Sequence, residues 1–353
     1  MVGDRAARLA TLDGMTSDPF GGVLRLSSPA DIIAMIPYML GFHPADSLVI
    51  VAMRERRPVL NVRVDLPGRR PGRPSAAELR RLLDQAVRMV TDQAAEATIL
   101  VGYGSRSRVT PVVARAATRL AGRGVPVLDA LRVTKGRYWS YVCTNTACCP
   151  AEGTPVDVAS SPVAAAATVA GMVALPDRAA VVSQVEPVDP AAQVEMWAAV
   201  GRADERLMGL ADTADLTDNP VGALIEAGDE ALDAALRRCR SGAGLTDDDL
   251  AWLSVLASLL PVGERFWRRI EESPDDRPAH RSLWLDALRR APMDLVPAVG
   301  SLAALTAWRD GDGALATAAL DRVLDVDPDY PPARVLDEAF AAGRRPAALD
   351  PRG

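Results

Sequence analysis

The sequence predicts an α/β N-terminal half with a mixed sheet, followed by an all-α C-terminal region. Short apolar runs alternate with helical patterns as far as about residue 155, and strand patterns stop beyond it. Two of the runs, residues 48–53 and 59–66, flank a charged turn and should pair as a hairpin. A hairpin beside strands that are connected through helices makes the sheet mixed.

The first helix of the α/β half should cover residues 31–40, with Ser28 as its cap and Pro29 at its first position. Pro37 lies inside this pattern and should kink the helix or end it early. A short strand is expected before it, at residues 22–26. Two further helices are expected at residues 76–91 and 108–122. The remaining strands are expected at residues 48–53, 59–66, 98–103, 125–133 and 137–143.

Helical periodicity continues through the C-terminal region. Helices are expected at residues 162–174, 190–210, 220–240, 246–260, 262–272, 281–290, 295–309, 313–325 and 332–342. Residues 303–328 resemble the helical hairpin of a tetratricopeptide repeat, and an ordinary αα-hairpin is the alternative. The expected organisation is a flexible N-terminus (1–20), an α/β domain (21–155), a helical region (156–345) and a flexible tail (346–353).

Composition excludes several classes of protein. Hydrophobic residues make up 49% of the chain and charged residues 24%, which is typical of a globular protein. A net charge of −6 argues against nucleic-acid binding, because a basic balance would be needed to neutralise phosphates. The longest alanine-rich apolar stretch, residues 163–175, is too short to span a membrane. With four cysteines and no signal-peptide pattern, a cytoplasmic location is expected.

Three of the four cysteines, Cys143, Cys148 and Cys149, fall within seven residues at the end of an expected strand. Thiolates bind zinc, and a fourth ligand would come from His43, His280, Cys239 or a carboxylate. The Cys-x4-Cys-Cys spacing differs from the usual paired Cys-x2-Cys arrangement. A redox pair in which Cys143 bridges Cys148 or Cys149 is a second interpretation. Buried, inert thiols are the third interpretation and the preferred one.

A second group of polar residues surrounds the hairpin. Asp46 and Ser47 precede its first strand, and Arg63 and Asp65 end its second. Because ligands often bind just beyond strand ends in open α/β sheets, Arg63 could hold a carboxylate or a phosphate. The structural alternative makes Asp46 a turn residue near the opposite end of that strand, and Arg63 and Asp65 a cross-strand ion pair.

Established catalytic patterns are absent from the sequence. Two histidines and no Gly-x-Ser-x-Gly elbow argue against a serine hydrolase. The loop at residues 102–108 follows a strand and precedes a helix, but it lacks the glycines and lysine of known phosphate loops. The arginine-rich loop at residues 69–74 is interpreted as a solvated surface loop.

Several stretches resemble the actinobacterial domain-of-unknown-function 4192 family. They are LSSPAD (26–31), PYMLGF (37–42), PADSLV (44–49), RVDLP (63–67), RYWSYVC (137–143), CCP (148–150), Gly153-Thr154-Pro155, WRDGDGA (308–314) and Asp327-Pro328. The resemblance implies a cytoplasmic protein and places Asp46, Ser47, Arg63, Asp65, Arg137 and the three clustered cysteines in the family pattern. The first five of these residues are the candidate ligand-binding residues. It implies no substrate, cofactor or partner.

The preferred functional hypothesis is a non-enzymatic cytoplasmic binding or regulatory module. Its α/β half would carry a ligand site or a structural metal site, with zinc as the metal. Its helical half would present a surface to a protein partner. The alternative is a metal- or thiol-dependent enzyme centred on Cys143, Cys148 and Cys149, with Asp46 or Asp65 as general base.

Overall fold

The computed structural model describes residues 12–13, 25–26, 28–68, 73–212 and 219–344. Apart from Leu12–Asp13, the segments expected to be flexible, 1–20 and 346–353, lie outside the described residues. The chain divides into two compact units, residues 1–178 with 341–343 and residues 179–340 with 344–353. Each unit is described by itself.

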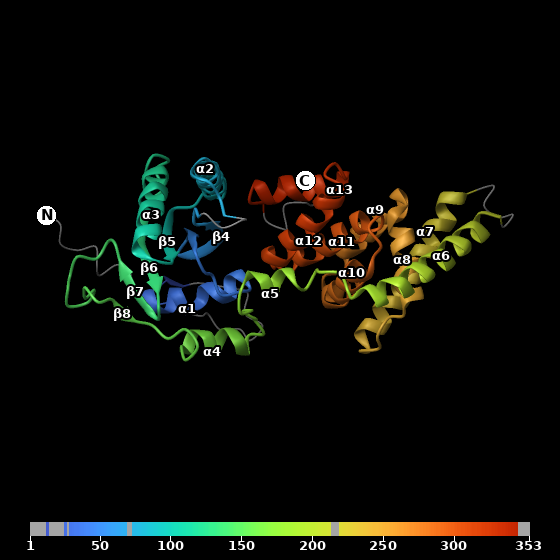
Figure 1. Ribbon diagram of the computed structural model, residues 1–353, viewed down its shortest axis with the longest axis horizontal. Helices are drawn as coiled ribbons and strands as arrows, with labels where there is room; N and C mark the ends of the chain where they lie inside the picture. Colours follow the sequence, from blue (N-terminus) through green and yellow to red (C-terminus); the bar gives the residue numbers. More distant parts are fainter. Residues whose placement is uncertain (1–11, 14–24, 27, 69–72, 213–218, 345–353) are drawn as a thin grey trace. The chain divides into compact units, whose positions relative to one another are not determined.

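The first unit is built on a six-stranded sheet with the strand order β4-β3-β5-β6-β7-β8 (Figure 1). Only β5 and β6 are parallel, and the other neighbours are antiparallel, so the prediction of a mixed sheet is confirmed. The strands are β3 (Ser47–Arg54), β4 (Arg57–Asp65), β5 (Ala97–Tyr103), β6 (Val127–Thr134), β7 (Arg137–Ser140) and β8 (Thr154–Pro155). A separate pair joins β1 (Leu12–Asp13) to β2 (Arg25–Leu26).

Helices cover both faces of this sheet. Alternate residues of β3 point to opposite faces, so the core that each residue joins shows which helices lie on that face. Leu48 and Ile50 belong to the core that includes α2 (Ala76–Asp92) and α3 (Arg106–Ala121). Val49 and Val51 belong to the core that includes α1 (Pro29–Leu40) and α4 (Pro162–Val169). The expected domain boundary at residue 155 stays a prediction. Helix α4, which follows that residue, belongs to the first unit and has Val163, Ala164 and Ala167 buried.

The first helix, α1, continues through Pro37 to Leu40, so the expected early end at this proline is wrong. A capping box between Ser28 and Asp31 starts the helix, and Gly41 ends it in the left-handed conformation with φ 78°. Ile36 and Pro37 are both buried, and Ile36 belongs to the core that includes strand residues, so burial stabilises the helix where a backbone hydrogen bond is missing.

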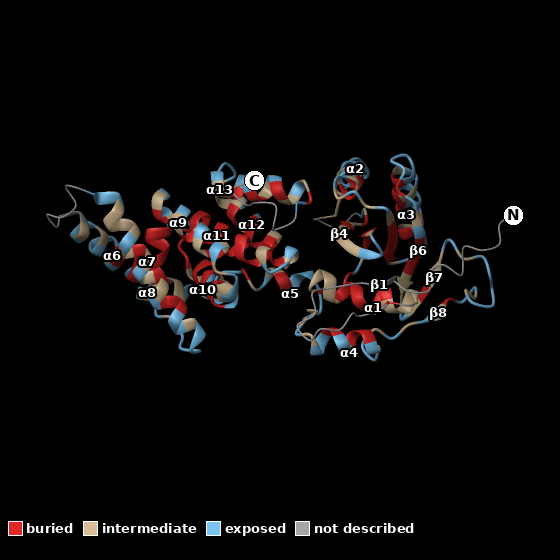
Figure 2. Cartoon of the chain, turned by 180° about the vertical axis from the view of Figure 1, so that it is seen from behind, coloured by how far each residue is buried: buried red, intermediate tan, exposed pale blue. Residues whose placement is uncertain are grey.

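The second unit is helical, as predicted. Its elements are α5 (Arg178–Val182), α6 (Pro190–Asp212), α7 (Pro220–Arg240), α8 (Asp247–Ser258), α9 (Leu260–Glu272), a 3-10 turn (Pro274–Asp276), α10 (Arg277–Arg290), α11 (Val296–Arg309), α12 (Gly313–Val326) and α13 (Pro331–Ala341). Residues 296–308 of α11 are all buried, and buried residues extend over much of α10 and α12 (Figure 2). The likeness of α11 and α12 to a tetratricopeptide hairpin stays a prediction.

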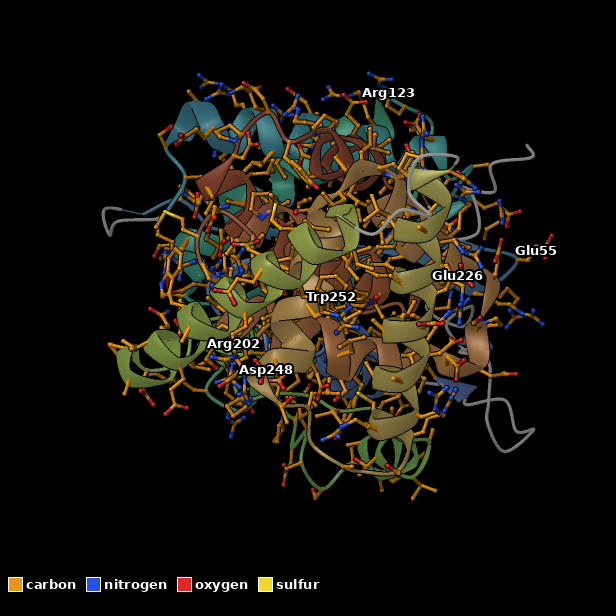
Figure 3. All side chains as sticks on the ribbon, turned by 90° about the vertical axis from the view of Figure 1, so that its right-hand side faces the viewer. Glu55, Arg123, Arg202, Glu226, Asp248 and Trp252 are labelled. Atoms are coloured by element: carbon orange, nitrogen blue, oxygen red, sulfur yellow. The ribbon has the colours of Figure 1, made fainter. Side chains whose placement is uncertain are left out.

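Helices α6 and α8 lie side by side at one end of this unit (Figure 3). Arg202 pairs with Asp248 at 2.6 Å, and the guanidinium of Arg206 lies 4.2 Å from the ring centroid of Trp252. The capping box of Thr246 and Asp249 starts α8, which confirms the helix start expected at this point. None of the described helices has both the length and the apolar character needed to cross a membrane.

Candidate functional site: a three-cysteine loop

The three clustered cysteines lie on the loop that connects β7 to β8 (Figure 1). β7 pairs with β6 on one side, and β8 pairs with β7 on the other, so both ends of the loop are fixed to the sheet. The amides of Cys148 and Cys149 both donate to the carbonyl oxygen of Asn145, at 3.3 and 2.8 Å. This turn brings Cys148 and Cys149 back toward Cys143.

The beginning of the loop is fixed by a buried carboxylate. One oxygen of Asp129 accepts hydrogen bonds from the Ser140 hydroxyl and from the amide of Ala130, each at 2.8 Å. The Ser140 hydroxyl oxygen in turn accepts from the amides of Val142 and Cys143, at 3.1 and 3.0 Å. Burial raises the pKa of Asp129, while its two hydrogen bonds act in the opposite direction.

The end of the loop is fixed by Trp139 and Arg137. The indole N–H of Trp139 donates to the carbonyl oxygen of Ala151 at 2.9 Å, and Arg137 donates to that of Gly153 at 2.7 Å. The guanidinium of Arg132 lies over the Trp139 ring, 3.6 Å from its centroid. Arg137, which the sequence placed among ligand-binding residues, therefore holds the backbone of the cysteine loop.

The three sulfur atoms form one group. The Sγ atoms of Cys143 and Cys148 are 3.2 Å apart, those of Cys148 and Cys149 are 3.6 Å apart, and all three lie within 4.8 Å of one another. Tetrahedral zinc with Zn–S bonds of about 2.3 Å places two thiolates about 3.8 Å apart. The spacing of the thiols is therefore close to what a shared metal ion requires.

The thiols are free and at least partly exposed, so the expectation that they are buried is wrong, while their inertness stays a prediction. Cys148 is exposed, and Cys143 and Cys149 are partly exposed. The loop lies beyond the end of β7, and polar contacts hold its backbone, as in the hydrogen bonds from Trp139 to Ala151 and from the amide of Cys143 to Ser140.

Hydrogen bonding among the three thiols makes their pKa values differ. Hydrogen bonds from Cys148 and Cys149 lower the pKa of Cys143. The same contact with Cys143 raises the pKa of Cys148, and burial together with the neighbouring thiols raises the pKa of Cys149 to about 12. Cys143 is therefore the thiol of the three that loses its proton most readily, and a bound cation would displace the protons of its neighbours.

The expected fourth ligands are not part of this group. Among the residues that the structure describes, the metal-ligating group at this loop consists of the three cysteines. His280 is fully buried within the helical unit, where its Nδ1 accepts a hydrogen bond from the indole of Trp284 at 3.2 Å. A metal ion held by the three thiolates alone would keep one coordination position for an outside ligand.

Asp46, Ser47, Arg63 and Asp65 come together at the end of the hairpin. Ser47 pairs with Asp65 across the two strands, so Asp46 lies at the same end of β4 as Asp65, and the expectation of opposite ends is wrong. Arg63 and Asp65 form an ion pair at 2.7 Å within one strand, not across two. The hairpin register explains both corrections, because an antiparallel pair brings the start of β3 to the end of β4.

Arg73, from the loop interpreted as solvated, and Arg108, from the loop at residues 102–108, complete this network. Arg73 donates to Asp65 at 2.8 Å and to Asp46 at 3.2 Å, and Arg108 pairs with the other oxygen of Asp46. Burial lowers the pKa of Arg63, and the adjacent Asp65 carboxylate acts against this shift. Ligand binding by Asp46, Ser47, Arg63, Asp65 and Arg137 stays a prediction, since each charged residue among them already has a protein partner.

Sequence reasoning missed Asp129, Ser140, Trp139 and Gly153 as parts of the cysteine site. One signal was present for Asp129, because it interrupts an otherwise apolar strand and a carboxylate buried there requires hydrogen-bond donors. The other three became recognisable only when the pairing of β6, β7 and β8 placed them at the loop.

A family model described as "Domain of unknown function (DUF4192)" matches residues 29–347, which is most of the chain and includes the cysteine loop. No curated protein and no solved structure matches the chain.

Proposed function

The chain belongs to the family of domain of unknown function 4192, and we propose that it binds a thiophilic metal ion, zinc in the first place, through Cys143, Cys148 and Cys149. The observation that carries this proposal is the convergence of three accessible sulfur atoms within 4.8 Å of one another. Soft thiolate ligands select zinc and similar ions over magnesium or calcium.

The construction of the loop supports the proposal independently of the sulfur distances. Metal ligands are usually held by a surrounding set of hydrogen bonds that fixes their orientation. Here Asp129 and Ser140 hold the backbone of Cys143, while Trp139 and Arg137 hold the segment that follows Cys149. An exposed loop without a function would have no need of a buried carboxylate at its base.

A binding or regulatory role is favoured over the enzymatic alternative. Three thiolates leave a fourth zinc position for an outside ligand, as in catalytic zinc sites. The general bases considered for an enzyme, Asp46 and Asp65, are however engaged by Arg73, Arg108 and Arg63. Moreover, β5 and β6 lie between β3 and β7, so β3, which follows Asp46, is roughly 14 Å from β7 across the sheet, and Asp65 on β4 lies one strand farther away.

In the same proposal, the helical unit presents a surface to a protein partner. On α6, the side chains of Val194, Trp197 and Met208 are 67%, 54% and 64% exposed. Their spacing places them on one side of the helix, and grouped exposed apolar side chains mark interaction surfaces. If the full-length Trp197→Glu variant captured the same partner as the wild type with equal affinity, this part of the proposal would be wrong.

Elemental analysis of the purified full-length protein, with thiol counting on the same sample, tests metal binding. We expect stoichiometric zinc in the wild type and its loss in the Cys143→Ser, Cys148→Ser and Cys149→Ser variants. Cys239→Ser is the matched control, because Cys239 is partly buried on α7 of the helical unit. Equal metal content in all four variants, or none in the wild type after zinc addition, would refute the proposal.

A further inference from the structure

The closest sulfur pair of the cysteine loop also has the geometry of a redox pair. We propose that Cys143 and Cys148 form a reversible disulfide on oxidation by a hydroperoxide, while Cys149 serves only as a metal ligand. The pairing stands on the geometry of the loop alone. Its consequence, release of the bound ion on oxidation, rests on the proposed metal binding.

The sulfur distances distinguish Cys148 from Cys149 as the partner of Cys143. The Sγ atoms of Cys143 and Cys148 are 3.2 Å apart, and a bond between them requires an approach to about 2.05 Å. Side-chain rotation with a small adjustment of the loop supplies this movement. Cys148 and Cys149 are 3.6 Å apart at sulfur, but they are consecutive residues.

Consecutive residues are poor disulfide partners. Their Cα atoms are about 3.8 Å apart across a trans peptide bond, whereas disulfides usually join Cα atoms about 4.4–6.8 Å apart. The described chain has no cis peptide bond that would change this spacing. A bridge between Cys148 and Cys149 would therefore distort the backbone, while a bridge between Cys143 and Cys148 closes a short loop that is already folded.

The reduced loop is organised for this bond before it forms. The carbonyl oxygen of Asn145 accepts from the amides of Cys148 and Cys149, and the hydroxyl of Ser140 accepts from the amide of Cys143. These contacts hold the backbones on both sides of the sulfur pair. Cys148 is exposed and Cys143 is partly exposed, so a small oxidant reaches them without unfolding.

The reaction balances with a hydroperoxide as the oxidant. The Cys143 thiolate attacks the peroxide, its sulfur takes up one oxygen as sulfenic acid, and hydroxide leaves, or an alkoxide if the peroxide is organic. The Cys148 thiol then attacks the Cys143 sulfur, the S–S bond forms, and water leaves with the Cys148 proton. The two thiols lose two electrons together and the peroxide gains them, and a dithiol reductant reverses the step.

The bridge removes two of the three metal ligands at once. A disulfide sulfur is no longer a thiolate, so Cys149 alone would remain to coordinate the ion. Because one thiolate cannot hold zinc against solvent, oxidation converts the loaded loop into a metal-free, cross-linked loop. Exposure of the site to peroxide would thus release the bound metal ion.

The experiment treats the zinc-loaded full chain with stoichiometric hydrogen peroxide and follows zinc with a chromogenic chelator. Thiols that stay reduced are blocked with iodoacetamide. The sample is then reduced and labelled with N-ethylmaleimide, so that mass spectrometry locates the cysteines that were bridged. We expect free thiols to fall from four to two, maleimide label on Cys143 and Cys148, and release of the bound zinc that dithiothreitol reverses.

The Cys149→Ser variant separates this inference from the proposed function. It should bind little zinc and still form the Cys143–Cys148 bridge, whereas Cys148→Ser should form none. If the wild type fails to bind zinc but bridges these two cysteines, metal binding fails and the pairing stands. If the wild type binds zinc but the maleimide label appears on Cys149, the inference is overturned and metal binding stands. The same holds if peroxide produces only intermolecular bridges or no disulfide.

Discussion

The indole ring of Trp139 occupies the space that a side chain on Gly153 would need. A Cβ atom added to Gly153 would lie 2.5 Å from the ring, which is closer than such atoms approach in real structures. Gly153 also has φ 84°, a left-handed conformation that glycine adopts without strain. Close packing of this pair fixes the point at which the cysteine loop returns to the sheet.

A Gly153→Ala substitution should therefore loosen the cysteine loop. Left-handed strain costs about 1–2 kcal/mol, and displacement of the Trp139 ring adds a cost of similar size. We expect a loss of about 2–4 kcal/mol in the free energy of unfolding of the α/β unit and weaker zinc binding. Gly171→Ala is the control, because Gly171 has φ 79° with no atom within 4 Å of the added Cβ. Equal effects of both substitutions on zinc affinity would show that the Trp139 contact is unimportant.

A Ser140→Ala substitution should weaken metal binding without removing a ligand. It leaves the amides of Val142 and Cys143 without their acceptor and removes a donor from the buried Asp129 carboxylate. Loss of such supporting contacts typically lowers metal affinity by about 10–100-fold. Competition with a chelator measures this change. Ser160→Ala, which removes a hydroxyl bonded to the exposed Asp157, should leave zinc affinity unchanged.

Zinc affinity should rise with pH, because the ion displaces thiol protons. The pKa values of Cys148 and Cys149 are raised, the latter to about 12, so both are protonated near neutral pH. Each thiol that loses its proton on binding adds about tenfold in affinity per pH unit. Chelator competition at several pH values between 6.5 and 8.5 should give a slope of about two decades per pH unit or steeper, since Cys148 and Cys149 each lose a proton. A pH-independent affinity would contradict coordination by these thiols.

The helical unit should lose stability on mild acidification through His280. Burial lowers the pKa of His280 to about 4, whereas an unfolded histidine titrates near 6.5. Between these values the unfolded state binds the proton and the folded state does not, so stability is present above about pH 6.5 and falls toward pH 4. The difference corresponds to about 3 kcal/mol at most.

His280→Gln tests this effect, since an amide oxygen can still accept from Trp284 and does not titrate. Urea unfolding at pH 7, 6, 5 and 4 should show a smaller decline in the variant than in the wild type. Parallel declines would assign the acid sensitivity to the carboxylates of the unit instead of His280.

Local sequence patterns were sufficient to predict most of the helices and strands. The hairpin of β3 and β4 followed from two apolar runs and a charged turn, and the helices of the second unit followed from their periodicity. Cys143, Cys148 and Cys149 were recognisable as a candidate site because they are close in sequence, and nearby residues stay close whatever the fold. Ser28 and Thr246 marked helix starts by the same local logic.

Tertiary structure alone decided which residues support and complete these groups. Asp129 reaches Ser140 only because β6 and β7 pair in a particular register, and Gly153 meets Trp139 only because β8 returns beside β7. Arg73 joins Asp46 to Asp65 because the hairpin brings the two carboxylates to one end. Such contacts depend on strand order and register, which are set by the packing of the whole core and not by any short stretch of sequence.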